Sequence, residues 1–136
     1  MNLDFASVWE MVADLVPEND ALICGEDIVS WKDYDIRSSK VASALVEAGL
    51  GPNSKAGLYL NNSNEYLIGQ NAIFKIGGVP INVNYRYVEE ELIYLLDNSD
   101  AEAVFYHACY SSRINEIAKS LPNIKAWIEV PDGSKS

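Results

Sequence analysis

The sequence predicts an α/β fold: a mostly parallel sheet with helices on both faces, preceded by a short N-terminal hairpin. Short apolar runs typical of buried strands alternate with longer segments that carry helical periodicity. Glycines stand where those helices should end. Such alternation favours right-handed crossovers and parallel pairing. With 136 residues, 49% of them hydrophobic, residues 1–136 are expected to form a single domain.

The N-terminal part of the chain predicts two helices around a hairpin. Apolar residues recur at helical spacing over residues 4–16, which indicates an amphipathic helix. The runs ALICG and IVSW, separated by two acidic residues, are typical of a β-hairpin. Ser30 is expected to cap the next helix, and Gly49 suits the left-handed position that ends it.

The rest of the chain alternates strands and helices. Asn62 is expected to cap a helix that ends at Gly77–Gly78. Glu89–Glu91 should lie on the first turn of another helix, where the macrodipole favours carboxylates. Ser111 or Ser112 should open the last helix. The strands expected to pair in parallel are AGLYL (56–60), VPINV (79–83), EAVFY (102–106) and KAWIEV (125–130).

Charge and composition exclude several classes of partner. The net charge is −10 and the basic residues are scattered, so we expect no nucleic-acid contact and no attraction to an anionic membrane. No apolar run approaches the roughly 20 residues of a membrane span. The first residues lack a basic segment before an apolar core, so a cytoplasmic protein is predicted. Cys24 and Cys109 lack metal-ligand spacing and are expected to be buried free thiols, with a mutual disulfide as the alternative.

Polar residues follow three of the predicted strands at the carboxyl end, where open parallel sheets bind ligands. We expect the asparagines there chiefly to cap helices and to accept unusual backbone angles, and the tyrosines to cover the apolar edge of the sheet. The segments are Asn61–Asn62, Asn82–Tyr87 and His107–Tyr110.

Two arginines are the candidate binding residues near this edge. Arg86 could meet a phosphate, or it could pair with Glu89 or Glu90 one turn away. Arg113 leaves the same alternatives open. His107 has neither a triad partner nor a second histidine, so we expect a bystander. The nucleotide motifs GxGxxG and GxxxxGK[ST] are absent, and no catalytic or metal-binding residue is predicted.

The order of motifs resembles a known family. SWKDY opens a helix that ends in AGL, NNSNEY follows a strand, and KIGGVPIN joins a helix to the next strand. Together with NVNYRYVEEELIYLLDNSDAEAVFY, this series resembles the N-terminal portion of the AMP-forming acyl-CoA synthetases. These enzymes belong to the adenylate-forming superfamily, and the likeness is to the fatty-acid CoA ligase branch.

The resemblance implies ATP-dependent activation of a carboxylic acid through an acyl-adenylate, then transfer to CoA, with Mg²⁺ beside the triphosphate. In that family, basic residues after the strand equivalent to EAVFY approach the CoA phosphates, and Arg113 is the nearest candidate. The family's hydroxyl-rich phosphate loop is missing, and the chain contains no threonine.

We therefore expect an N-terminal fragment that is inactive alone. Its expected partner is the remainder of its own enzyme, or a second copy that covers the exposed apolar surface. The alternative is a stand-alone binding or regulatory module derived from this lobe.

Overall fold

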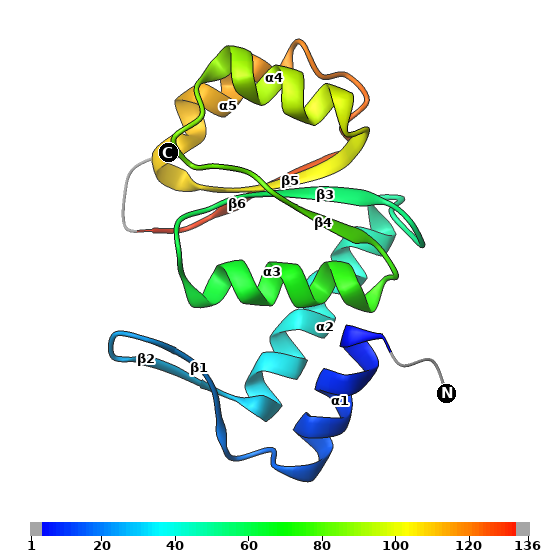
Figure 1. Ribbon diagram of the computed structural model, residues 1–136, viewed down its shortest axis with the longest axis vertical. Coiled ribbons are helices and arrows are strands. Elements are labelled where there is room, and N and C mark those ends of the chain that lie inside the picture. The colour runs from blue at the N-terminus through cyan, green and yellow to red at the C-terminus, as the bar shows by residue number, and fades with distance from the viewer. Residues whose placement is uncertain (1–3, 133–136) are drawn as a thin grey trace.

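A four-stranded parallel sheet forms the centre of the computed structural model, which describes residues 4–132 (Figure 1). Every neighbouring pair in the sheet is parallel, as predicted, and AGLYL pairs with VPINV in that sense. In the order in which they lie side by side, the strands are β4 (Val79–Asn82), β3 (Lys55–Tyr59), β5 (Ala101–His107) and β6 (Ala126–Val130).

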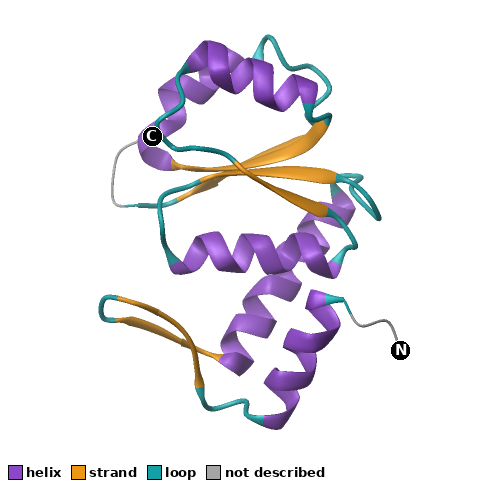
Figure 2. Cartoon of the chain, in the orientation of Figure 1, coloured by secondary structure: helices purple, strands orange, loops and turns teal. Residues whose placement is uncertain are grey.

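Helices cover both faces of this sheet, which confirms the predicted α/β class (Figure 2). On one face lie α2 (Trp31–Glu47) and α3 (Asn64–Lys75); on the other lie α4 (Glu89–Asn98) and α5 (Ser111–Ala118). Alternation along the strands divides the core between the two faces. Leu58 and Phe105 face α2 and α3, whereas Tyr59 and Val104 face α4 and α5.

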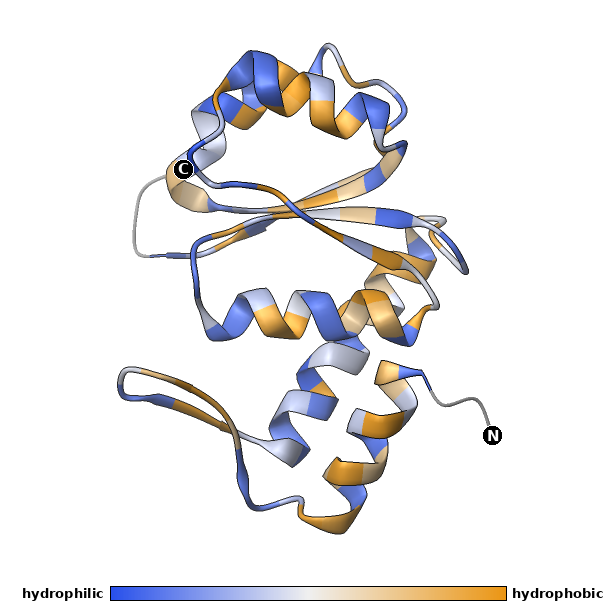
Figure 3. Cartoon of the chain, viewed as in Figure 1, coloured by the Kyte–Doolittle hydropathy of each residue, from blue (hydrophilic) through white to orange (hydrophobic). Residues whose placement is uncertain are grey.

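The N-terminal elements pack outside the α2–α3 layer. They are α1 (Phe5–Leu15), β1 (Asp20–Cys24) and β2 (Asp27–Ser30), and the two strands form the predicted antiparallel hairpin. Leu22 and Val29 on its inner face join a small core with Ile68 of α3. Figure 3 shows hydrophobic residues on α1 and on the hairpin. These N-terminal elements therefore add a second, smaller apolar core to the one that lies between the sheet and α2–α3.

Buried charge joins the first three helices. Lys75 on α3 lies 2.8 Å from Glu10 on α1 and 2.7 Å from Asp35 on α2, and its side chain is almost fully buried. Desolvation opposes the charge, but the hydrogen bonds to Asp35 and Glu10 outweigh it and raise the pKa of Lys75. The charged lysine therefore holds α1 onto the other two helices.

Glycines end two helices as the sequence predicts. Gly49 has φ of +100°, its N–H donates to Val46 O at 3.0 Å, and the Leu50 N–H donates to Leu45 O at 3.0 Å. This is the Schellman arrangement, in which a left-handed residue lets the last carbonyls find donors. Gly77, with φ of +75°, ends α3 in the same way.

The predicted cap of α3 is wrong by one residue. Asn62 was expected to cap the helix, but α3 begins at Asn64 and its cap is Ser63, whose hydroxyl accepts from the Tyr66 N–H at 3.2 Å. Asn62 has Glu65 three residues later, a spacing that imitates a capping box. Ser63 lies in extended backbone, with φ of −167°, which brings its hydroxyl to the Tyr66 amide instead.

The cysteine prediction is half wrong. Cys24 and Cys109 are free thiols, as predicted, but both are exposed rather than buried. Cys24 ends β1 at the hairpin tip, and Cys109 lies in the single 3₁₀ turn after β5. Cys24 is therefore at the end of a strand and Cys109 just beyond one, and neither lies in a buried middle of a strand. Within residues 4–132, no helix combines the length and the apolar character that crossing a membrane would need.

Candidate functional site at the carboxyl edge of the sheet

The structure brings the predicted polar segments together at one edge. Because β3, β4 and β5 run parallel, Asn61 and the loop 83–88 follow the carboxyl ends of neighbouring strands, and His107 is the last residue of β5. Arg113 enters the same region from the first turn of α5. The edge expected to carry function is therefore a real spatial cluster, and its internal bonds decide what each residue can do.

Tyr59 organises the loop after β4. Its side chain is fully buried, and its hydroxyl donates to the Tyr87 carbonyl oxygen at 2.9 Å, with the Tyr85 carbonyl oxygen 3.3 Å away. Arg113 Nη1 donates to the Tyr59 hydroxyl at 2.8 Å and to the Tyr87 carbonyl oxygen at 3.2 Å. Burial raises the pKa of Tyr59, so the phenol stays protonated and keeps its donor.

Arg113 is engaged inside the protein. Besides its bonds to Tyr59 and Tyr87, its Nε lies 3.5 Å from a carboxylate oxygen of Glu89. The hydrogen bond to Tyr59 is the largest cause that raises the pKa of Arg113. Sequence reasoning missed Tyr59 as its partner, because an apolar strand gives no sign of where a phenol will end. The only available signal was that a buried tyrosine hydroxyl needs a hydrogen-bond partner.

Arg86 is the cation that this edge leaves exposed. Its guanidinium lies over the Tyr85 ring at 5.7 Å from the ring centre, and its backbone N–H donates to Asn84 Oδ1 at 2.9 Å. The alternative in which Arg86 pairs with Glu89 or Glu90 is not formed: Glu89 pairs with Arg113, and Arg86 has no ion pair within residues 4–132. Its charge is therefore available to a ligand.

The asparagines and the histidine have structural partners. The Tyr66 hydroxyl donates to Asn82 Oδ1, and Asn84 bonds the loop backbone as described. Asn61 and His107 bond each other, through the Asn61 N–H and His107 Nδ1 at 3.0 Å. The contacts are structural, but not in the predicted way: Ser63 and Val88 cap α3 and α4, and none of these asparagines has a positive φ. His107, expected to be a bystander, accepts a hydrogen bond from a neighbouring strand end. Within the described part of the chain, no group of three or more His, Cys, Asp or Glu residues could hold a metal ion.

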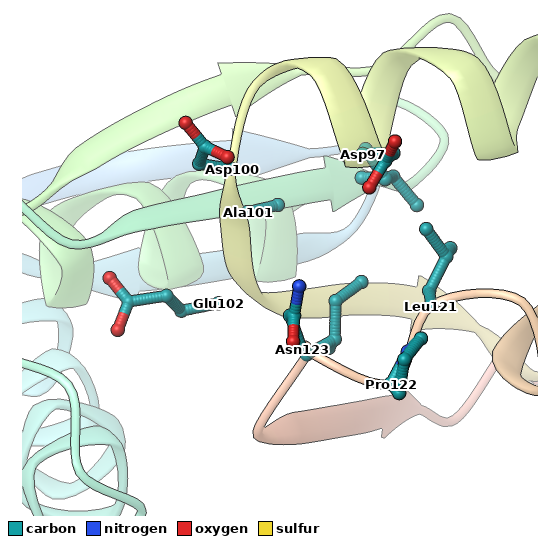
Figure 4. Close-up of a pocket in the computed structure, with 9 residues that line it drawn as sticks. Asp97, Asp100, Ala101, Glu102, Leu121, Pro122 and Asn123 are labelled. Atoms are coloured by element: carbon teal, nitrogen blue, oxygen red, sulfur yellow. The ribbon is translucent and has the colours of Figure 1, made fainter.

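A small pocket lies at the opposite edge of the sheet. Its volume is about 90 Å³, and Figure 4 shows carboxylates of Asp97, Asp100 and Glu102 around it. These residues stand before or at the start of β5, so the pocket belongs to the amino ends of the strands. The hydrogen bond from Lys125 lowers the pKa of Glu102 and keeps it charged. Its acidic lining is unsuited to an anionic nucleotide.

Residues 9–135 match the family described as AMP-binding enzyme. The chain belongs to this family. It is 39% identical over 132 residues to the medium/long-chain-fatty-acid–CoA/3-oxocholest-4-en-26-oate–CoA ligase of Mycobacterium marinum. The aligned region covers 97% of this chain and 24% of that relative. It is also 39% identical over 134 residues to the 3-oxocholest-4-en-26-oate–CoA ligase of Rhodococcus rhodochrous, with 98% of the chain and 24% of the relative covered.

Solved structures agree with the AMP-binding fold. The N-terminal domain of FACL13 from Mycobacterium tuberculosis superposes with a TM-score of 0.86, at 19% identity over 96% of this chain and 34% of that one. A benzoate CoA ligase from Burkholderia xenovorans gives 0.85, at 18% identity over 95% of this chain and 26% of that one. Such identities show the fold alone. The chain spans about a quarter of the length of the curated relatives it matches.

Proposed function

We propose that this chain is the N-terminal part of an ATP-dependent acyl-CoA synthetase that acts on a carboxylic acid of the fatty-acid class. The carboxylate would attack the α-phosphorus of ATP and release pyrophosphate, and the CoA thiol would then displace AMP from the acyl-adenylate. One observation carries this proposal: identity of 39% to a fatty-acid–CoA ligase extends over 97% of the chain.

The residues at the carboxyl edge of the sheet are proposed to contribute phosphate contacts to that reaction. Exposed Arg86 can offer its guanidinium to a phosphate of the nucleotide or of CoA, because no carboxylate within residues 4–132 neutralises it. Arg113 is the second candidate phosphate contact, although its present partners make it chiefly a support for the loop that carries Arg86. Neither arginine is assigned a catalytic role.

The residues described do not fit a complete metal–triphosphate site. No group of three or more His, Cys, Asp or Glu residues that could hold a metal ion occurs within residues 4–132, and the net charge of −10 repels a polyanion. Among the cations of the carboxyl edge, Arg86 alone is without an internal ion pair in the described residues. ATP, CoA and Mg²⁺ are therefore proposed as ligands of a longer enzyme, and the isolated chain is proposed to be inactive.

Exposed apolar residues support a macromolecular partner. Ile23 and Ile28 form a cross-strand pair on the outer face of the hairpin and are 67% and 55% exposed. Leu15 on α1 and Tyr94 on α4 are also largely exposed. We propose that further parts of the same polypeptide, or a second copy of the chain, cover these side chains. A cytoplasmic location remains a prediction.

The experiment that tests this function starts from the gene. An open frame that continues into a hydroxyl-rich, threonine-containing loop supports a synthetase, and the longer polypeptide should then form acyl-adenylate from ATP and a fatty acid. An authentic stop codon after Ser136 would contradict the proposal and favour a stand-alone binding module. A longer polypeptide that folds but forms no adenylate with acids of several lengths would also overturn it.

A further inference from the structure

Asn61, the second residue after β3, is held by three hydrogen bonds. Its N–H donates to His107 Nδ1 at 3.0 Å, its carbonyl oxygen accepts from the Ser63 hydroxyl at 3.1 Å, and its Oδ1 accepts from the Tyr110 hydroxyl at 2.7 Å. Ser63 in turn caps α3. The bonds therefore run from β5, through Asn61, to the first turn of α3.

These bonds cross the point in the sheet where the order of successive strands reverses, although all the strands stay parallel. From β3 the chain goes outward to β4, then returns past β3 to β5 and continues to β6, so the reversal lies between β3 and β5. In open parallel sheets, the crevice at such a reversal is the usual ligand site. His107 and Tyr110 reach Asn61 from the β5 side, and the Tyr110 ring packs on Tyr59 at 4.6 Å between centres.

The geometry restricts the imidazole to one chemical form. His107 is only 4% exposed, and its Nδ1 accepts a hydrogen bond from a backbone N–H. A ring nitrogen that accepts carries no proton, so the proton of the neutral ring must be on Nε2. The opposite tautomer would place two donors against each other in a buried place, which costs free energy.

We propose that His107 is a positioning residue: as the Nε2–H tautomer it latches Asn61 and, with Tyr110, ties the end of β3 to the end of β5. The latch fixes the turn that leads into α3. A phosphate-bearing ligand then reaches this edge over β4, where Arg86 is exposed, and not between β3 and β5. Only this last consequence rests on the proposed function; the latch itself rests on the hydrogen bonds.

The direct test is NMR of the uniformly ¹⁵N-labelled chain. An N–H···N hydrogen bond transmits a measurable ¹⁵N–¹⁵N coupling, so a cross-peak should join the Asn61 amide nitrogen to His107 Nδ1. The long-range imidazole spectrum should show the Nε2–H form. Absence of the coupling, or a ring protonated at Nδ1, would overturn the latch. Neither readout depends on activity, so failure of the proposed function would leave this result standing.

Two variants separate positioning from simple packing. In His107→Asn the side-chain oxygen can take the place of Nδ1 as acceptor, whereas His107→Leu keeps apolar volume without an acceptor. Amide hydrogen exchange at Asn61 should be accelerated roughly fivefold or more in His107→Leu and changed little in His107→Asn. Equal exchange in both variants would refute the role. If His107→Leu does not fold, the coupling in the unmodified chain still decides.

A matched control removes only the other half of the latch. Tyr110→Phe deletes the bond to Asn61 Oδ1 and leaves the Asn61 N–H against His107 Nδ1. The coupling should persist in this variant, while the resonances of the Asn61 side-chain amide move. Loss of the coupling in Tyr110→Phe would show that His107 does not hold the backbone by itself, and would contradict the proposal.

Discussion

At the scale of single residues, buried hydrogen-bond partners decide which side chains face a ligand. Arg86 and Arg113 look alike in the sequence, since both follow a strand and both lie near acidic residues. Arg113 is engaged because the Tyr59 hydroxyl lies 2.8 Å from its Nη1, and the same phenol organises the loop that leaves Arg86 exposed. The difference between the two arginines is thus set by one tyrosine on a central strand.

Tyr59→Phe should destabilise the chain because it removes a buried hydroxyl that serves two partners. Arg113 loses one acceptor and the Tyr87 carbonyl loses one donor. Arg113 and the Tyr87 carbonyl keep their bond to each other, so the loss of the two bonds to the phenol should cost about 1–2 kcal/mol in the free energy of unfolding, measured by urea titration. Tyr94→Phe is the control, since Tyr94 is 72% exposed, and it should stay within about 0.5 kcal/mol. Equal losses in the two variants would contradict the account.

The alkylation rate of Cys109 should rise at higher pH than the alkylation rate of an ordinary cysteine. Although the residue is exposed, desolvation of its thiol, followed by the hydrogen bond to Asp132, raises the pKa of Cys109 above its usual value of 9.0. The thiolate is the reactive form. Its rate with iodoacetamide should therefore begin to rise at higher pH than that of an unstructured cysteine peptide. Cys109→Ser assigns the signal by mass spectrometry, and a profile at or below that of the peptide would refute the shift.

At the scale of elements, helix ends and strand runs could be predicted because local chemistry decides them. The sequence predicts Gly49 as the end of α2, because glycine readily adopts the left-handed conformation that this ending needs. It also predicts the start of α4, because Glu89–Glu91 favour the first turn of a helix. The cap of α3 was misplaced because Asn62 and Ser63 are both good caps and only the backbone angles choose between them. The bonds of Tyr59 and His107 could not be predicted, because they depend on which strands become neighbours.

Gly49→Ala tests the helix ending against a matched glycine. With φ of +100° at Gly49, a Cβ has ordinary contacts but forces an L-residue into a left-handed conformation, which costs about 1–2 kcal/mol. Gly51 lies two residues later, has no positive φ, and a Cβ there meets nothing within 4 Å. Thermal or urea unfolding should show a clear loss for Gly49→Ala and little change for Gly51→Ala. The reverse order would contradict the assigned ending.

At the scale of the whole molecule, the exposed apolar residues predict association. Ile28 on the outer face of the hairpin is exposed, while Val29 beside it points into the core. Light scattering at increasing concentration should show dimers or larger species if a second copy covers this face, and Ile28→Lys should reduce them. A strict monomer at high concentration would leave the remainder of a longer polypeptide as the proposed partner.

We propose that this chain is a scaffold for a nucleotide site completed elsewhere, and pyrophosphate exchange tests this proposal most directly. The chain would be mixed with ATP, Mg²⁺ and fatty acids of several lengths, and ATP would be titrated separately by calorimetry. We predict exchange no greater than that of a heat-killed control, because the described residues lack a metal cluster and the chain carries a net charge of −10. Exchange above that control, or an ATP dissociation constant below roughly 10 µM, which is about −7 kcal/mol, would contradict the claim.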